Sequence, residues 1–202
     1  MGQEIQCTLR FEGRSSKGKA LLESKEILFR GDVRLKIPFT NIKKLEARNG
    51  DLYVRTMDGL AVLALGAKAE QWQHKILHPK SLVEKLGVKA GETVGTLGAL
   101  PASFLAELAD NGVRATKGKV AATSPWIFLA AESLADLDKL KAVRNSMGPA
   151  AGLWIIYPKG VKGITENDVR GAGLRAGLVD VKVASFSETH TALKFAIPKG
   201  QR

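Results

Sequence analysis

The stretch GLWIIYPKGVKGITENDVRGAGLRAGLVDVKVASFSETHTALKFAIPK, residues 152–199, decides the fold of the second half of the chain. It begins with an unbroken apolar run, residues 152–157, which predicts a strand covered on both faces. Residues 165–177 predict a helix, because a threonine followed by acidic residues is typical of a helix N-terminus and a glycine ends the pattern. Two alternating runs, 181–186 and 192–197, then predict a β-hairpin.

Upstream of this stretch, strands and helices alternate along the chain. The predicted strands are 92–97 and 126–130, with one or two weaker strands within 113–122, and the predicted helices are 102–109 and 133–147. Such alternation predicts a parallel sheet with helices on both faces and right-handed crossovers. The sequence therefore predicts a small Rossmann-like three-layer α/β domain over residues 87–202, ending in an antiparallel hairpin.

The first half of the chain has a different sequence pattern, in which short runs of alternating apolar and polar residues are separated by turn residues such as Asn49-Gly50 and Asp58-Gly59. The predicted strands are 5–11, 18–23, 26–30, 33–39, 42–48, 52–57 and 60–65, followed by a helix over 67–78. Seven antiparallel strands must curl to bury one face. We therefore expect an antiparallel β-barrel with a C-terminal helix over residues 1–86, and an α+β protein of two domains.

The segment GKALLESKEILFRGDVRLKIPFTNIKKLEARNGDLYVRTMDG, residues 18–59, resembles bacterial members of the pleckstrin-homology (PH)/GRAM superfamily, and the resemblance covers roughly residues 5–78. It implies a PH-like barrel that binds either a protein or an anionic lipid or phosphate surface. In the second case the resemblance points to a basic loop between the first two strands, with Arg14, Lys17 and Lys19. The alternative is that these residues form an ordinary solvated turn.

The second half resembles a bacterial domain-of-unknown-function family, three-zero-five-two, over roughly residues 84–199. The resemblance rests on KLGVKAGETVGTLGAL, GLWIIYPKG and ITENDVRGAGLRAGLVDVKVASFSETHTALKF, and brings no activity or site residue with it. Its element order also resembles the C-terminal half of Rossmann-type methyltransferases. The first strand carries only Gly95 and Gly98 before Pro101, and the next strand has no acid to bind a ribose, so we predict no cofactor.

Six polar residues are candidates for a ligand-binding edge. Lys159 ends a buried strand, where ligands bind in open α/β sheets, and a helix N-terminus that attracts anions follows it. A histidine and a carboxylate at the hairpin tip could supply acid–base chemistry. The alternative is that all six form ordinary caps and turns. The candidates are Lys159, Thr165, Glu166, Glu188, Thr189 and His190.

Charge and composition leave several functions open. The net charge of +11 is spread along the chain, which gives only a diffuse basis for contact with nucleic acid. His74 and His78 share a helical face without a third ligand nearby, so no metal site is predicted. A single cysteine, a polar start and the absence of an apolar run of about 20 residues predict a cytoplasmic protein without a transmembrane segment.

Three functions remain open. The favoured hypothesis is a non-enzymatic interaction or scaffold protein with a degenerate methyltransferase-like domain and a protein partner. The alternative is a binder of a small molecule, such as a nucleotide or an S-adenosylmethionine-like compound, or an enzyme acting at the edge of the second sheet. A second alternative is a nucleic-acid-associated protein.

Overall fold

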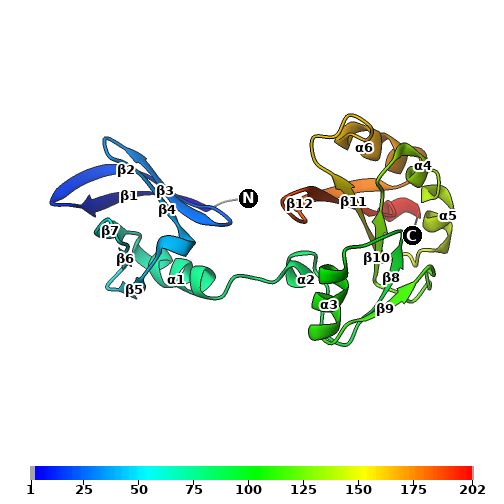
Figure 1. The fold of residues 1–202 in the computed structure, drawn as a ribbon, viewed down its shortest axis with the longest axis horizontal. Helices are drawn as coiled ribbons and strands as arrows, with labels where there is room; N and C mark the ends of the chain where they lie inside the picture. Colours follow the sequence, from blue (N-terminus) through cyan, green and yellow to red (C-terminus); the bar gives the residue numbers. More distant parts are fainter. Residues whose placement is uncertain (1–2, 202) are drawn as a thin grey trace. The chain divides into compact units, whose positions relative to one another are not determined.

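The computed structural model describes residues 3–201, and its contacts divide the chain into two compact units, residues 1–80 and 81–202 (Figure 1). The first unit has seven strands followed by a helix. These elements are β1 (Gln3–Phe11), β2 (Arg14–Leu22), β3 (Glu26–Gly31), β4 (Arg34–Pro38), β5 (Lys44–Arg48), β6 (Asp51–Arg55), β7 (Leu60–Ala64) and α1 (Ala69–Leu77). All seven predicted strands and the helix are confirmed.

The seven strands form one curled antiparallel sheet with the order β4-β3-β2-β1-β7-β6-β5. The prediction of a barrel is wrong in one respect, because β4 and β5 are the two edges and do not pair with each other among residues 3–201. Helix α1 explains why closure is unnecessary. Trp72 on α1 is 1% exposed and packs in the same apolar cluster as Leu9 and Phe29, so the helix covers the concave face that strand pairing leaves open.

The second unit contains six strands and five α-helices within the described residues. They are α2 (Leu82–Lys85), β8 (Thr93–Leu97), α3 (Ala102–Asp110), β9 (Arg114–Lys117), β10 (Trp126–Ala130), α4 (Leu134–Leu137), α5 (Leu140–Ser146), β11 (Gly152–Pro158), α6 (Glu166–Arg175), β12 (Val179–Ser185) and β13 (His190–Ala196). Their sheet order is β12-β13-β11-β10-β8-β9. Strands β9, β8, β10 and β11 are parallel, and β13 is antiparallel to both β11 and β12.

Helices cover both faces of this mixed sheet, as predicted. On β11, Leu153 and Ile155 belong to an apolar cluster that includes residues of α4, α5 and α6. The alternate residues Trp154 and Ile156 belong to a second cluster with residues of α2 and α3. Because successive side chains of a strand point to opposite faces, the two clusters are the two sides of the sheet.

Two predicted elements differ from those observed. The helix predicted over 133–147 is divided, because the N–H of Asp138 bonds to the carbonyl of Ala135, a tighter turn that ends α4 before α5 begins. The weak strands predicted within 113–122 reduce to β9, after which Gly118 adopts a positive φ of 73°. Both differences reflect local hydrogen bonding that apolar periodicity does not encode.

Helix α2 belongs to the second unit, although the sequence placed residues 81–86 with the first. Val83 and Leu86 are each 1% exposed and pack with Phe104 and Trp154. The indole N–H of Trp154 also donates a hydrogen bond of 3.0 Å to the carbonyl of Leu86. The indole ring therefore fixes the end of α2 against β11.

Within residues 3–201, no helix combines the length and the apolar character needed to cross a membrane. The cytoplasmic location stays a prediction.

Candidate functional site

The carboxyl edge of the parallel strands in the second unit contains a point where the chain reverses direction across the sheet. From β8 the chain passes through α3 to β9 on one side, and then returns to β10 on the other side of β8. Helix α3 packs in the cluster with Phe128, whereas α4 and α5 pack in the cluster with Ile127. The segments that follow β8 and β10 therefore leave toward opposite faces, and such a divergence is where open α/β sheets bind ligands.

Gly98 shapes the first of these two segments. Its φ is +77°, and a Cβ atom at this position would lie 2.7 Å from the carbonyl oxygen of Ala130 at the end of β10. Glycine is required for both reasons, because other residues disfavour this φ and would clash with the neighbouring backbone. The backbone after β8 thus turns in direct contact with the end of β10.

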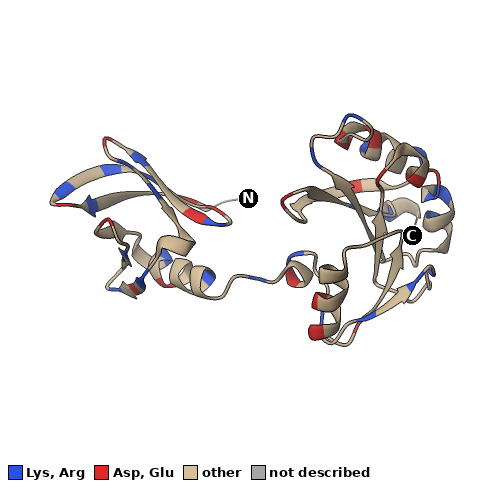
Figure 2. Cartoon of the chain, in the orientation of Figure 1, with Lys and Arg blue, Asp and Glu red and all other residues tan. Residues whose placement is uncertain are grey.

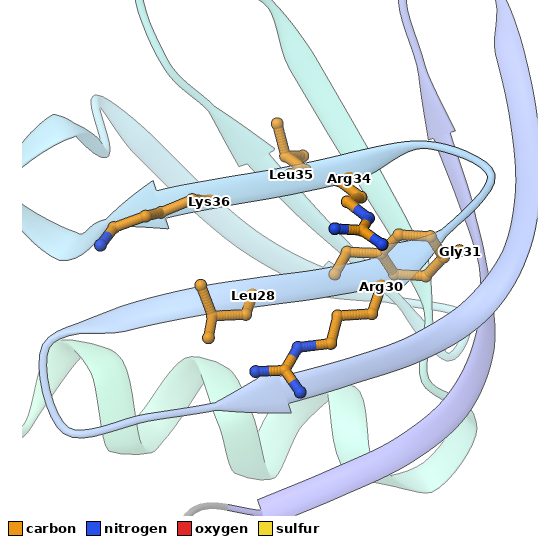
Figure 3. Close-up of a pocket in the computed structure, with 7 residues that line it drawn as sticks. Leu28, Arg30, Gly31, Arg34, Leu35 and Lys36 are labelled. Atoms are coloured by element: carbon orange, nitrogen blue, oxygen red, sulfur yellow. The ribbon is translucent and has the colours of Figure 1, made fainter.

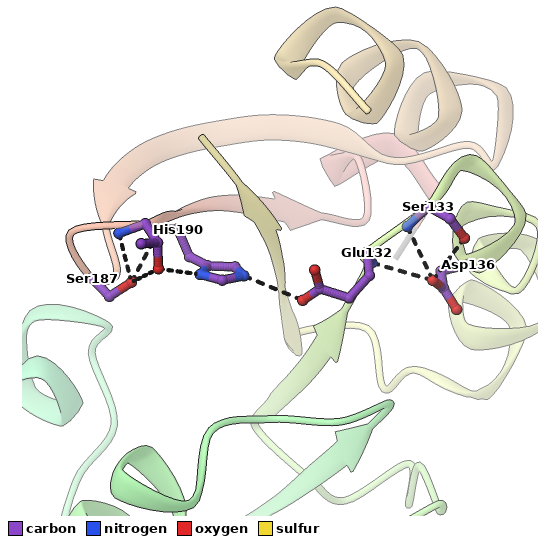
Figure 4. Close-up of polar contacts among 6 residues, drawn as sticks. Glu132, Ser133, Asp136, Ser187 and His190 are labelled. Atoms are coloured by element: carbon purple, nitrogen blue, oxygen red, sulfur yellow. Dashed lines mark hydrogen bonds and ion pairs between the residues drawn. The ribbon is translucent and has the colours of Figure 1, made fainter. Parts of the chain in front are cut away.

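Glu132 follows β10 at the same edge. Its carboxylate Oε1 lies 3.2 Å from Nε2 of His190, and the Glu132 side chain is 59% exposed against 22% for His190 (Figure 4). His190 reaches this position because it begins β13 and pairs with Pro158 at the end of β11. A carboxylate and an imidazole, separated by 58 positions in the sequence, therefore meet beside the reversal point.

The hairpin tip holds His190 through its hydroxyl groups. The Oγ1 of Thr189 lies 2.9 Å from Nδ1 of His190, while Oγ of Ser187 accepts from the backbone N–H groups of Thr189 and His190 at 3.2 and 3.0 Å. On the other side of the pair, the backbone N–H of Glu132 donates to Asp136 at 3.2 Å (Figure 4). These bonds hold both ring nitrogens of His190 in polar contacts.

Lys159 lies at the same hairpin, but its ammonium group is already engaged. Its Nζ donates to Oγ of Ser185 at 3.1 Å and to the carbonyl of Ser187. Its backbone N–H also bonds to the carbonyl of Thr189 at 2.8 Å. The contacts of Lys159 therefore stabilise the hairpin that positions His190, and they hold its positive charge close to the candidate site.

Thr165 and Glu166 belong to a different network, at the start of α6. Thr165 forms a capping box with Asp168, in which its Oγ1 accepts the N–H of Asp168 at 3.2 Å and its own N–H donates to the carboxylate at 2.9 Å. The Thr165 hydroxyl, which also bonds that carboxylate, lowers the pKa of Asp168. The predicted N-cap is confirmed, and the hydroxyl group of Thr165 is occupied by it.

Glu166 accepts hydrogen bonds from Tyr157 at 3.2 Å and from Arg170 at 2.8 Å. Burial, and then the neighbouring Glu166 carboxylate, raise the pKa of Tyr157 to about 12. Because this carboxylate binds an arginine and a phenol, its role is to fix α6 against β11.

Of the six predicted residues, three therefore meet at one place: Lys159, Thr189 and His190. Glu188 lies exposed at the hairpin tip and makes contacts of its own. Sequence reasoning missed Glu132 and Asp136. The available signal was the position of Glu132 directly after a buried strand, but only the topology shows that this strand neighbours the reversal point.

The predicted basic loop of the first unit is wrong as a structural description. The turn between β1 and β2 consists of residues 12–13, and Arg14, Lys17 and Lys19 lie on β2 itself. Lys17 and Lys19 share one face of the strand, whereas Arg14 is in the opposite alternation. Lys19 also pairs with Glu4 at 3.0 Å.

The rings of His74 and His78 lie in contact, tilted by 44° with their centroids 4.8 Å apart. Across residues 3–201, no group of three or more histidine, cysteine, aspartate or glutamate residues is arranged to hold a metal ion.

No protein-family model and no curated protein matches the chain. The resemblance to the domain-of-unknown-function family therefore stays a prediction, as does the PH/GRAM resemblance of the first unit.

Among solved structures, similar ones include methyltransferases. The TehB-like SAM-dependent methyltransferase from Corynebacterium glutamicum is 11% identical with a TM-score of 0.42, and the match covers 64% of this chain and 96% of that one. A SAM-dependent methyltransferase from Aquifex aeolicus is 20% identical with a TM-score of 0.42, over 60% and 90% of the two chains. The pyocyanin biosynthetic protein PhzM is 11% identical with a TM-score of 0.42, over 65% of this chain and 59% of its own.

At TM-scores below 0.5, these similarities by themselves assign neither a cofactor nor an activity. They give no support to the prediction of a non-enzymatic scaffold.

Proposed function

We propose that the second unit binds a small molecule at the carboxyl edge of β8 and β10, and that the ligand is a nucleotide or an S-adenosylmethionine-like compound. The observation that carries the proposal is the meeting of the Gly98 turn with the Glu132–His190 pair at the reversal point. This is the alternative hypothesis from the sequence, a small-molecule binder, but the binding site now lies at the edge between β8 and β10 and no longer includes the start of α6.

The chemistry of the edge fits such a ligand. The half-exposed carboxylate of Glu132 has lone pairs to spare for ribose hydroxyl groups or an amino group. The turn at Gly98 lets the backbone after β8 pass in direct contact with the end of β10, so the segments that follow the two strands border one edge of the sheet. The first turn of α3 follows directly; the N–H of Phe104 bonds to the carbonyl of Pro101 at 3.0 Å, and Pro101 offers no side-chain acceptor to the N–H groups of Ala102 and Ser103.

One feature of nucleotide-binding sheets is replaced here. In a dinucleotide site an acidic residue near the end of the second strand binds the ribose, whereas β9 reads Arg-Ala-Thr-Lys and ends in Lys117. Glu132, on the opposite side of β8, would take over the role of that acid. The proposal concerns binding, and a chemical step by His190 would be a second stage to test.

The test is a thermal-shift and calorimetric screen of the full chain with S-adenosylmethionine, its demethylated product, ATP and AMP. A ligand at 100 times its dissociation constant stabilises the folded state by about 2.7 kcal/mol. Glu132→Gln should weaken binding at least tenfold, which is about 1.4 kcal/mol. The matched control is Asp110→Asn, an exposed acid at the far end of α3 with the same change in charge.

A screen in which none of the four compounds changes the melting temperature would contradict the proposal. Equal weakening by Glu132→Gln and Asp110→Asn would also contradict it, since binding would then follow net charge. Either result would return the interaction-protein hypothesis to first place. Protein partners and nucleic acid stay predictions.

A further inference from the structure

The outward face of the first unit carries cations that lie directly opposite one another on neighbouring strands. Lys19 on β2 pairs in register with Arg30 on β3, and Arg30 pairs with Arg34 on β4. Neighbouring strands are about 4.8 Å apart. Like charges placed directly opposite each other in a sheet are mildly destabilising, so an anion bound to this row would relieve the repulsion.

Within the described part of the chain, the two arginines of the row have no neutralising side chain. Lys19 pairs with Glu4 at 3.0 Å, and the nearby Lys36 pairs with Glu26 at 3.0 Å. In the part of the chain from residue 3 to 201, the side chains of Arg30 and Arg34 make no hydrogen bond or ion pair with an acid. Both are exposed, so their five N–H donors each are available to a ligand.

A cavity of about 700 Å³ lies at the same place. Figure 3 shows the arginines on opposite strands of the β3–β4 hairpin, with Leu28 beside them and Lys36 further along β4. Among the described residues 3–201, no carboxylate lines this cavity. Its lining residues are Leu28, Phe29, Arg30, Gly31, Arg34, Leu35 and Lys36. Lysine and arginine also mark β2, β3 and β4 in the charge view (Figure 2).

We propose that this cavity binds a phosphate-bearing ligand, with a phosphate group shared by the guanidinium groups of Arg30 and Arg34 and with Lys36 further along the lining. A guanidinium group forms paired hydrogen bonds to phosphate oxygens, and two facing guanidinium groups can share the terminal oxygens of one phosphate. A single carboxylate would satisfy fewer of these donors. The site lies in the first unit and is separate from the function proposed above.

A second facing pair of cations provides the contrast. Lys44 on β5 pairs in register with Arg55 on β6, also on a hairpin. The cavity beside them is smaller, about 260 Å³, and Glu46 lines it and pairs with Lys44 at 3.3 Å. Because Glu46 lines this second cavity and neutralises Lys44, we expect it to bind phosphate more weakly, although Lys44 and Arg55 face each other in the same way.

The experiment compares the double variant Arg30→Gln/Arg34→Gln with the matched control Lys44→Gln/Arg55→Gln. Each removes two facing cations from a hairpin of the same sheet and lowers the net charge by two. Calorimetry with inorganic tripolyphosphate measures binding to a free phosphate compound. Co-sedimentation with phosphatidylcholine vesicles, with and without phosphatidylglycerol, measures binding to a lipid phosphate. Circular dichroism checks that both variants fold.

We expect at least a tenfold loss of affinity in the Arg30/Arg34 variant and less than a twofold change in the control. Binding to tripolyphosphate alone would identify a free phosphate compound as the source, and binding only to vesicles with phosphatidylglycerol would identify a lipid headgroup. Equal loss in both variants would overturn the proposal, because binding would then follow the diffuse charge. Failure of the unaltered chain to bind either probe would overturn it too.

Discussion

The place of α2 in the second unit makes Leu86 a sharp test of the fold. Leu86 is 1% exposed among Phe104, Trp154 and Val83. Replacing such a leucine with alanine removes buried apolar surface and leaves a cavity, at a cost of about 2–5 kcal/mol. With a urea dependence of about 2 kcal/mol per M, the unfolding midpoint of the second unit should fall by roughly 1–2.5 M.

The assay is urea unfolding of the full chain, with hydrogen exchange measured by mass spectrometry to separate the units. Strand β10 reports the second unit and β2 reports the first. The control is Leu77→Ala at the end of α1, where the leucine is 53% exposed and the change should cost less than about 0.5 kcal/mol. A midpoint shift of less than about 0.3 M for Leu86→Ala, or faster exchange in β2 in place of β10, would refute the assignment of α2.

Four further predictions concern α6 and its surroundings. Thr165→Ala should lower the free energy of unfolding by about 0.5–2 kcal/mol in urea unfolding, because the capping box is lost; an unchanged value would mean that the cap is dispensable. Gly173→Ala should destabilise by up to about 2 kcal/mol in the same assay, since a Cβ would lie 2.2 Å from the ring of Phe195 and overpacking outweighs the gain in helix propensity. Gly171→Ala, which meets only the flexible end of an arginine, should stabilise by up to about 1 kcal/mol, and the same sign for both glycines would contradict the packing of α6. The pKa of Tyr157 is raised from 10.0 to about 12 in the folded state, so the unfolded chain loses this proton first and stability should fall as the pH rises from 10 to 12; Tyr157→Phe should flatten that decline in urea titrations at pH 9 to 11.

Regular local patterns made most of the fold predictable. The apolar run at β11 and the threonine cap at Thr165 are short-range signals, and the structure confirms both. The boundary near residue 86 was misplaced because α2 is held by Trp154, a contact 68 positions away that no local pattern shows. The sequence predicts a barrel because seven antiparallel strands must curl to bury one apolar face. The pattern alone cannot show whether that face is buried by pairing of the edge strands or by a helix that carries Trp72.

The candidate site was less predictable than the fold. His190 and Lys159 were found because polar residues at a strand end or a hairpin tip stand out in the sequence. Glu132 was missed because its importance depends on β10 lying next to β8, and strand order across a sheet is a long-range property. The same holds for Arg30 and Arg34, which are ordinary surface arginines until the register places them opposite each other.

The position of β13 has a consequence for how the chain is made. Residues 190–196 insert between β11 and β12, and Leu193 and Phe195 complete the apolar cluster on one face of the sheet. During synthesis, β11 leaves the ribosome with its outer edge unpaired and with both apolar faces incompletely covered. The second unit therefore cannot finish folding until residue 196 has emerged from the ribosome. A ribosome stalled before His190 would leave the apolar strand GLWIIYP with an unpaired edge, to which chaperones or other nascent chains could bind.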